Sequence, residues 1–279
     1  MAVYLSEHKG VSFSNPKEPH FFSDDIKEKR KIRTISHYEN IFPEKHGPTK
    51  KGEGSIWYLY SKVAPGNIKK HNENAKIIIM IRDPIDFIES LHNQNVIGGH
   101  EKNRDIDFSI QTSISGKSSK FNLDYVELSK YAKYIDVYIE AFGRENVLIL
   151  LQEELKEKPR ETYLRVLDFL SLTDDRRTDF KSVNERRTHK YKILEFFLTR
   201  NWVYVSRAIE PLRRMLGVGS LGIYKKVMDF NSKKAGTKSM SGSAENDIKK
   251  ALKNDMDKLM NITQEDKLKL HWKRFFKCQ

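Results

Sequence analysis

The clearest pattern in the chain is a short, uninterrupted run of apolar residues, Ile77–Ile81. Five residues are too few for a buried helix, and their β-branched side chains favour a strand that is covered on both faces. The run ends at Arg82, and Asp83 and Pro84 then suit the N-cap and the first position of a helix. The pattern therefore predicts a strand, a turn that carries Arg82, and a helix.

The same junction is a candidate anion site. Arg82 would lie at the carboxyl end of the strand, and Ser90 would lie two turns into the helix. In open α/β sheets, ligands bind at the carboxyl ends of the strands. An arginine fork beside a hydroxyl and a positive helix end suits a phosphate. The alternative is a salt-bridged arginine that closes a strand and a serine on a solvated helix face.

Apolar spacing places further elements along the chain. In the helix predicted at 159–172, we expect Leu164, Leu167 and Leu170 to face the core. Residues 97–122 have no clear period and are expected to form a long functional or mobile loop. Residues 231–245, rich in Ser, Gly and Lys, are expected to be a flexible connection to a C-terminal helix. The remaining predictions are helices at 1–8, 125–142, 196–216 and 248–259, a short helix from residue 65, and a buried strand at 146–151.

Composition indicates one folded domain over residues 1–279, with 38% hydrophobic and 11% aromatic residues. The net charge of +13 implies anionic partners in general but does not choose among nucleotides, sulfated or phosphorylated substrates and nucleic acid. A single cysteine, Cys278, excludes an internal disulfide framework and a cysteine-based metal cage. No apolar run approaches the roughly 18 residues of a membrane span. With no hydrophobic signal core at the N-terminus, the expected location is the cytoplasm.

The segment IRDPIDFIESLHNQ, residues 81–94, resembles the nucleotide-binding segment of sulfotransferases that use 3′-phosphoadenosine 5′-phosphosulfate. This resemblance implies that Arg82 and Ser90 hold the 3′-phosphate of the nucleotide. NPKEPHFFSDD, residues 15–25, resembles the K-E-x-H-F-F segment of the Golgi-type and bacterial members.

By that second resemblance, Glu18 would be the general base that takes the proton from an acceptor hydroxyl or amine. Lys17 and His20 would line the same site. An in-line displacement at a tetrahedral anion depends mostly on positioning and charge stabilisation, as in phosphoryl transfer. The alternative for Glu18 is an ordinary loop carboxylate before a proline.

Two more segments extend the resemblance. GEGSIWYLY, residues 52–60, resembles a family strand and turn that border the acceptor pocket, although Gly54 stands where some relatives carry a lysine. Trp57 is therefore a candidate for acceptor contact, with ordinary aromatic packing as its alternative. SVNERRTHKYKIL, residues 182–194, lies where relatives place a basic loop over the nucleotide. The candidates there are Arg186, Arg187 and Lys190, with a solvated charged face as the alternative.

The resemblance implies a three-layer α/β fold similar to that of P-loop NTPases, with a central parallel sheet flanked by helices. It also implies 3′-phosphoadenosine 5′-phosphosulfate as co-substrate, no metal, and a small-molecule or glycan acceptor, carbohydrate first. The family's P-K-x-G-T-T phosphosulfate loop is absent from the sequence, so the domain is expected to be incomplete at its N-terminus. We expect its neighbouring strands to show unpaired edges.

Three alternatives remain at this level. A catalytically inactive, truncated relative would only bind nucleotide. A kinase-like phosphotransferase would require a Walker-type lysine and a magnesium aspartate, and neither motif is visible. A nucleic-acid-binding protein is supported by the net charge alone, because the basic residues are spread along the chain without interleaved aromatic residues. The oligomeric state is not predicted.

Overall fold

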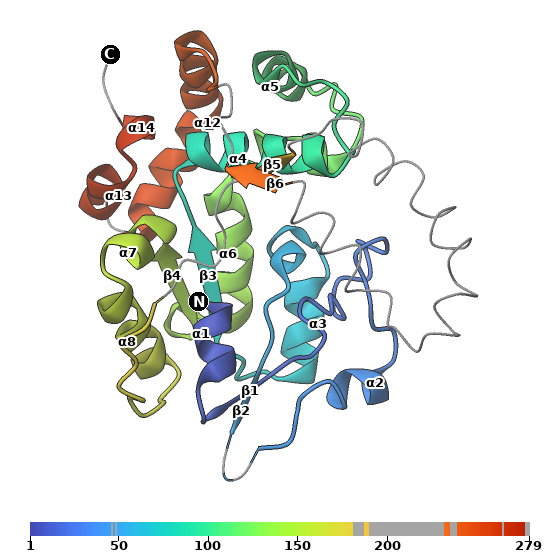
Figure 1. Ribbon diagram of the computed structural model, residues 1–279, viewed down its shortest axis with the longest axis vertical. Helices are drawn as coiled ribbons and strands as arrows, with labels where there is room; N and C mark the ends of the chain where they lie inside the picture. The colour runs from blue at the N-terminus through green and yellow to red at the C-terminus, as the bar shows by residue number, and fades with distance from the viewer. Residues whose placement is uncertain are drawn as a thin grey trace. The chain divides into compact units, whose positions relative to one another are not determined.

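The computed structural model divides the chain into two compact units (Figure 1). It describes residues 1–45, 47, 49–180, 239–263 and 265–276, and the backbone of 187–189 and 232–234. The first unit comprises Met1–Asp83, Lys130–Val183 and Lys253–Gln279, and the second comprises Pro84–Ser129 and Asn184–Leu252.

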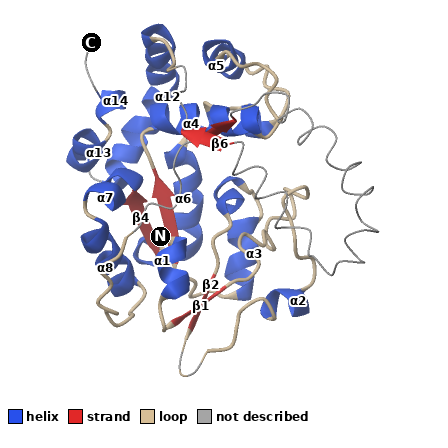
Figure 2. Cartoon of the chain, viewed as in Figure 1, coloured by secondary structure: helices blue, strands red, loops and turns tan. Residues whose placement is uncertain are grey.

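The first unit contains most of the described elements (Figure 2). Its strands are β1 (Val11–Phe13), β2 (Lys50–Gly52), β3 (Ile77–Ile81) and β4 (Val147–Leu151). Its helices are α1 (Ala2–Glu7), α2 (Ile35–Glu39), α3 (Ala64–His71), α6 (Tyr131–Phe142), α7 (Gln152–Glu157), α8 (Pro159–Phe169), α13 (Glu265–His271) and α14 (Lys273–Phe276). Two 3₁₀ turns, Ile56–Tyr60 and Arg144–Asn146, precede α3 and β4.

The predicted apolar strands pair with each other. β3 and β4 run parallel, in a register that opposes Ile77 to Val147 and Ile81 to Leu151. Helix α6 packs against both strands, and α8 packs against β4. These contacts confirm a parallel β-sheet that is covered by helices. The other strands of this unit, β1 and β2, form a separate parallel pair.

The core beside β4 is built by α1, β1, β4 and α8, with Val11 as the contribution of β1. Tyr4 and Leu5 of α1 pack with Leu150 of β4 and with the buried face of α8. That face consists of Tyr163, Val166 and Leu167, all at most 2% exposed. The prediction that Leu164 faces the core is wrong, since 37% of it is exposed. The buried face follows the spacing 163, 166, 167, and position 164 lies about 100° away on the helix.

Helix α6 has a defined start and end. It begins at Tyr131, later than the predicted 125–142, and the preceding residues include a 3₁₀ turn at Glu127–Ser129. The backbone N–H groups of Ala132 and Lys133 each donate to the carboxylate of Asp255, at 3.0 Å. Gly143 ends the helix with a φ of 82°, a conformation that favours glycine. Gly143 is therefore the C-cap of α6.

The second unit contains α4 (Pro84–Ile97), α5 (Ile106–Ile114), the 3₁₀ turns Phe121–Leu123 and Glu127–Ser129, and the antiparallel strands β5 (Arg187–His189) and β6 (Ser232–Lys234). Helix α12 (Gly242–Thr263) begins in this unit and continues into the first. Residues 97–122 are not a single loop as predicted, because Asp105 accepts hydrogen bonds from Asp107 and Phe108 and starts α5. Within the predicted flexible connection 231–245, β6 and the start of α12 are formed, whereas 235–238 lie outside the described residues.

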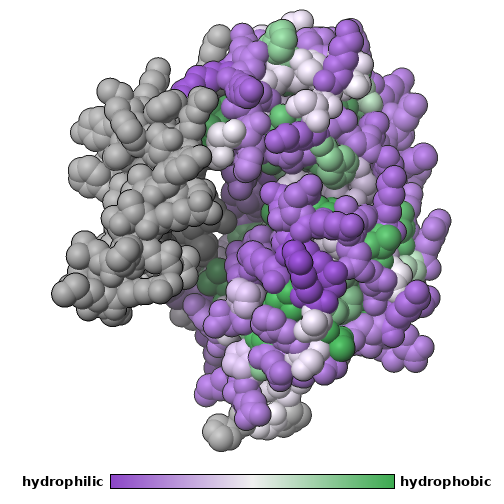
Figure 3. Space-filling model, turned by 90° about the vertical axis from the view of Figure 1, so that its right-hand side faces the viewer, coloured by the Kyte–Doolittle hydropathy of each residue, from purple (hydrophilic) through white to green (hydrophobic). Residues whose placement is uncertain are grey.

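The predicted helix at 196–216 also lies outside the described residues. No helix in the described part of the chain is long and apolar enough to cross a membrane. The face drawn in Figure 3 is mainly hydrophilic, with apolar side chains scattered among charged ones. This surface agrees with a composition in which 32% of residues are charged.

Candidate active site

The loop before α2 carries three of the predicted site residues, Lys17, Glu18 and His20. Glu18 and His20 have φ values of 57° and 52°, which are uncommon for residues other than glycine. Lys31 holds this loop in place, since its N–H donates to the carbonyl of Pro19 at 3.0 Å and its Nζ donates to the carbonyl of Lys17 at 2.9 Å. Strained backbone that is fixed by its surroundings is a feature of functional sites.

The structure brings the three side chains together around the Glu18 carboxylate. One oxygen, Oε1, lies 3.8 Å from Nζ of Lys17, and the other, Oε2, lies 3.6 Å from Nε2 of His20. The side chain of Glu18 is 28% exposed and that of His20 is 3% exposed. The His20 ring also packs edge-on against Tyr58, at 6.0 Å between ring centroids. A solvent-accessible carboxylate is thus held between a cation and a buried imidazole.

These neighbours keep Glu18 ionised. The contact with the His20 imidazole is the main cause of a lowered Glu18 pKa, and the charges of Lys17 and Lys31 lower it further. Partial burial opposes the shift without cancelling it. A carboxylate that stays ionised and reaches solvent is in the correct protonation state to accept a proton from an approaching hydroxyl or amine, while its lowered pKa makes it a weaker base than a free glutamate.

The Glu18 pKa gives a first prediction. His20→Ala is expected to raise the pKa of the Glu18 carboxyl, because it removes the largest contribution that lowers this pKa. Carbon-13 NMR titration of the glutamate carboxyls would measure the shift. Lys17→Ala, which removes a smaller contribution, should shift it less. A larger effect from Lys17→Ala would contradict the assignment.

The same shift has a stability consequence with a defined sign. Because the folded-state pKa of Glu18 lies below its ordinary value of 4.5, the ionised carboxylate stabilises the fold at higher pH. This contribution is present above 4.5 and is lost as the pH falls through the folded-state pKa.

Glu53, which the sequence analysis does not place in the site, supports the loop through a network of hydrogen bonds. Its Oε1 accepts hydrogen bonds from the hydroxyls of Tyr38 at 2.8 Å and Tyr58 at 3.0 Å, and its Oε2 accepts one from Ser55 at 2.6 Å. The Ser55 hydroxyl in turn accepts the backbone N–H of His20 at 3.0 Å. Burial raises the pKa of Glu53, and its three hydroxyl donors partly offset that rise.

Trp57 follows this network in the 3₁₀ turn Ile56–Tyr60 and remains partly exposed. Nζ of Lys29 lies 5.2 Å from the centre of its ring, within the range of a cation–π contact. The Tyr60 ring lies beside it at 5.8 Å between centroids. With a partly exposed indole and a cationic neighbour, Trp57 remains a candidate for acceptor contact.

Arg82 and Ser90 occupy the predicted elements. Arg82 directly follows β3 in the first unit, and its charge acts on the buried hydroxyl of Tyr131, lowering a pKa that burial raises. Ser90 lies on α4, which begins at Pro84 as predicted, in the second unit. The backbone N–H of Asp83, between them, donates to Glu153 Oε1 at 3.1 Å.

The predicted basic loop is mostly outside the described residues. This applies to Arg186 and Lys190, while Arg187 is the first residue of β5 and its side chain is not described. Among the residues that are described, no group of three or more histidine, cysteine, aspartate or glutamate side chains is placed to hold a metal ion.

Comparison with known proteins bears on this arrangement. The family model of the sulfotransferase domain matches residues 59–201, just over half of the chain. The chain belongs to the sulfotransferase domain family. The matched region includes the β3–α4 junction with Arg82 and Ser90, whereas Glu18 and His20 precede it.

Curated relatives of this sulfotransferase domain carry related names. Heparan sulfate glucosamine 3-O-sulfotransferase 3B1 of Mus musculus is 26% identical over 168 residues, which cover 56% of this chain and 38% of the relative. Isoform 3A1 of the same species is 25% identical over 164 residues, with the same coverage. The chain therefore spans well under half of the length of these relatives.

A solved structure shows the fold of the domain. The crystal structure of a sulfotransferase from Alicyclobacillus acidocaldarius is 23% identical and superimposes with a TM-score of 0.58. The match covers 80% of this chain and 91% of the bacterial one. It confirms the predicted α/β sulfotransferase fold.

Proposed function

We propose that the domain transfers a sulfuryl group from 3′-phosphoadenosine 5′-phosphosulfate to a hydroxyl or amine of an acceptor, with a carbohydrate as the acceptor class. The observation that carries this proposal is the solvent-accessible Glu18 carboxylate between Lys17 and His20, in a chain of the sulfotransferase domain family. The names of the relatives, which act on heparan sulfate glucosamine, support a glycan acceptor.

In the proposed reaction, Glu18 accepts the proton of the acceptor hydroxyl or amine while the acceptor oxygen or nitrogen forms a bond to sulfur. The bond between sulfur and the bridging oxygen of the donor breaks, and 3′,5′-phosphoadenosine leaves with that oxygen. Lys17 supplies positive charge beside the developing anions, and His20 orients Glu18. We assign acceptor contact to Trp57.

Donor recognition is assigned to Arg82 and Ser90, which would bind the 3′-phosphate. Arg186, Arg187 and Lys190 are proposed partners of the nucleotide on the basis of their sequence position. This part of the proposal rests on the segment at residues 81–94 and on the family.

A transfer assay tests the proposed reaction. The chain would be incubated with donor that carries a sulfur-35 label, and with heparan sulfate, desulfated heparan sulfate or a simple phenol as acceptor. Label is expected on a glycan. Nucleotide binding without transfer to any acceptor would instead support the inactive, nucleotide-binding relative, and label on the phenol alone would overturn the carbohydrate acceptor.

Donor recognition can be tested separately by titration calorimetry with 3′,5′-phosphoadenosine. Arg82→Ala is expected to weaken binding about tenfold or more, because a hydrogen bond to a charged group contributes about 1.5–3 kcal/mol. Ser90→Ala should cost less, since a neutral hydroxyl contributes about 0.5–1.5 kcal/mol. Arg33→Ala, at an exposed arginine, is the matched control and should leave the affinity unchanged. Equal affinities for Arg82→Ala and the unmodified chain would contradict the assignment.

A further inference from the structure

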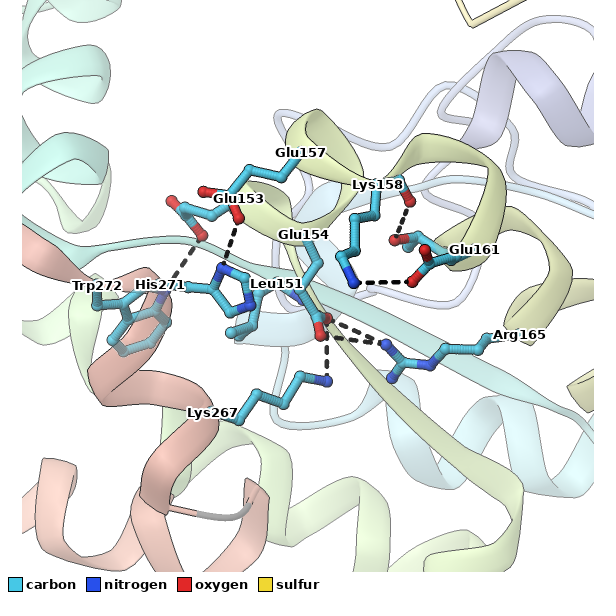
Figure 4. Close-up of polar contacts among 11 residues, drawn as sticks. Leu151, Glu153, Glu154, Glu157, Lys158, Glu161, Arg165, Lys267, His271 and Trp272 are labelled. Atoms are coloured by element: carbon cyan, nitrogen blue, oxygen red, sulfur yellow. Dashed lines mark hydrogen bonds and ion pairs between the residues drawn. The ribbon is translucent and has the colours of Figure 1, made fainter. Parts of the chain in front are cut away.

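Three acidic residues of α7, which directly follows β4, contact α13 or the residue after it (Figure 4). The carboxylate of Glu154 lies 3.0 Å from Nζ of Lys267, and the carboxylate of Glu157 lies 3.2 Å from Nδ1 of His271. Burial opposes ionisation of Glu154, but its pairing with Lys267 and Arg165 keeps its pKa below the ordinary value. The third acidic residue, Glu153, makes a different contact.

Glu153 connects the segment after α13 to the residue that follows Arg82. Its Oε2 accepts the indole N–H of Trp272 at 3.1 Å, as Figure 4 shows. Its Oε1 accepts the backbone N–H of Asp83, also at 3.1 Å. The Asp83 carboxylate in turn accepts the backbone N–H of Phe275 at 3.0 Å. Asp83 is therefore joined directly to Phe275 of α14, and through the shared acceptor Glu153 to Trp272, the residue before α14.

Three of the residues that make these hydrogen bonds are buried. Trp272 is 0% exposed, Asp83 is 3% exposed and Phe275 is 8% exposed. The Trp272 ring also packs edge-on against Tyr131, at 6.0 Å between centroids. Glu153 itself is partly buried, but the residues that donate to it lie in the core, where a donor left without its acceptor is costly. The contacts therefore define one position for Asp83.

The position of Asp83 determines that of its neighbour. The Asp83 N–H belongs to the peptide group that joins Arg82 to Asp83, and this group is planar. When Glu153 fixes the N–H, it fixes the plane in which the backbone leaves Arg82. This sets the point and direction from which the Arg82 side chain leaves the backbone, and so the region that its guanidinium can reach.

We propose that Trp272 and Glu153 are positioning residues for Arg82, and that they align its guanidinium with the 3′-phosphate of the donor nucleotide. This inference rests on the proposed donor recognition and adds to it a role for the segment after α13. Neither residue touches the nucleotide in this proposal. Each acts through the backbone of the turn after β3.

Calorimetry with two nucleotides separates positioning from general stability. The affinities for 3′,5′-phosphoadenosine and for adenosine 5′-monophosphate would be measured on the unmodified chain, Trp272→Phe, Arg82→Ala and the double variant. Trp272→Phe keeps an aromatic ring in place but removes the N–H donor. It is expected to weaken binding of 3′,5′-phosphoadenosine about tenfold, the loss expected when about one hydrogen bond to a charged group is impaired. Binding of the monophosphate should not change, because it lacks the 3′-phosphate.

The double variant supplies the decisive comparison. If Trp272 acts through Arg82, Arg82→Ala together with Trp272→Phe should bind no more weakly than Arg82→Ala alone. Leu167→Ala, in α8 and the core beside β4, controls for lost thermal stability. It should leave the affinities for both nucleotides unchanged.

Each other outcome overturns a defined part of the proposal. Three results would overturn the positioning role and leave donor recognition by Arg82 intact. They are additive losses of affinity in the double variant, equal losses for both nucleotides in Trp272→Phe, and an unchanged affinity of Trp272→Phe for 3′,5′-phosphoadenosine. If the unmodified chain binds 3′,5′-phosphoadenosine no more tightly than adenosine 5′-monophosphate, the proposed donor recognition fails, and the positioning role fails with it.

Discussion

Glu18→Gln is expected to lower the rate of sulfate transfer by about 10²–10⁴-fold, the usual contribution of a general base. The carboxamide has nearly the same size and can remain beside Lys17 and His20, but it cannot accept the proton of the acceptor. The effect should therefore fall on kcat. The affinity for 3′,5′-phosphoadenosine, measured by calorimetry, should stay within about twofold, since no donor contact is assigned to Glu18.

Two controls make this result specific. Glu28→Gln removes an exposed carboxylate a short distance along the same segment and should leave kcat unchanged. Thermal unfolding of Glu18→Gln should show that the loop keeps its structure. If transfer by Glu18→Gln remained within a few fold of the unmodified chain, Glu18 would not be the base, and the Lys17–Glu18–His20 cluster would have a structural role instead.

The strands and the main junction could be predicted because their signals are local. The apolar runs of β3 and β4 fix both the strands and their burial, and Pro84 fixes the start of α4. Helix α5 was missed because its start depends on the Asp105 side chain, which accepts N–H groups from Asp107 and Phe108. This signal is easily overlooked in a serine-rich and glycine-rich stretch. At Leu164, spacing alone allowed two faces of α8, and packing against β4 selected the other one.

The site shows the same division between local and distant signals. Lys17, Glu18 and His20 are close in sequence, so a single loop brings them together. The contact between Glu153 and Trp272 joins residues 119 positions apart, and no local pattern indicates it. Glu53 stands in the GEGS segment, but its importance comes from Tyr38 and Tyr58, whose side chains meet it through the folded core.

Glu53→Ala is expected to lower the free energy of unfolding by about 2–4 kcal/mol, because three hydroxyls would lose their acceptor and each buried unsatisfied group costs about 1–3 kcal/mol. Those of Tyr38 and Tyr58 lie in an aromatic cluster where water cannot easily replace the carboxylate. The loss of the Ser55 contact should also release the backbone of His20 and reduce sulfate transfer. Urea unfolding followed by circular dichroism would measure the stability change.

Glu53→Gln separates the acceptor role from the charge. Both tyrosine hydroxyls bind the same carboxylate oxygen, which a carboxamide can reproduce, and the Ser55 oxygen can accept the new N–H in addition to that of His20. Burial raises the pKa of Glu53, which means that the buried charge is costly. Removing this charge therefore offsets part of any loss in the free energy of unfolding. The expected cost is therefore below about 1 kcal/mol, with most transfer activity retained. Glu39→Ala, at an exposed carboxylate on α2, is the control and should change neither the free energy of unfolding nor the transfer activity. An equal loss of stability in Glu53→Gln and Glu53→Ala would mean that the charge itself holds the network.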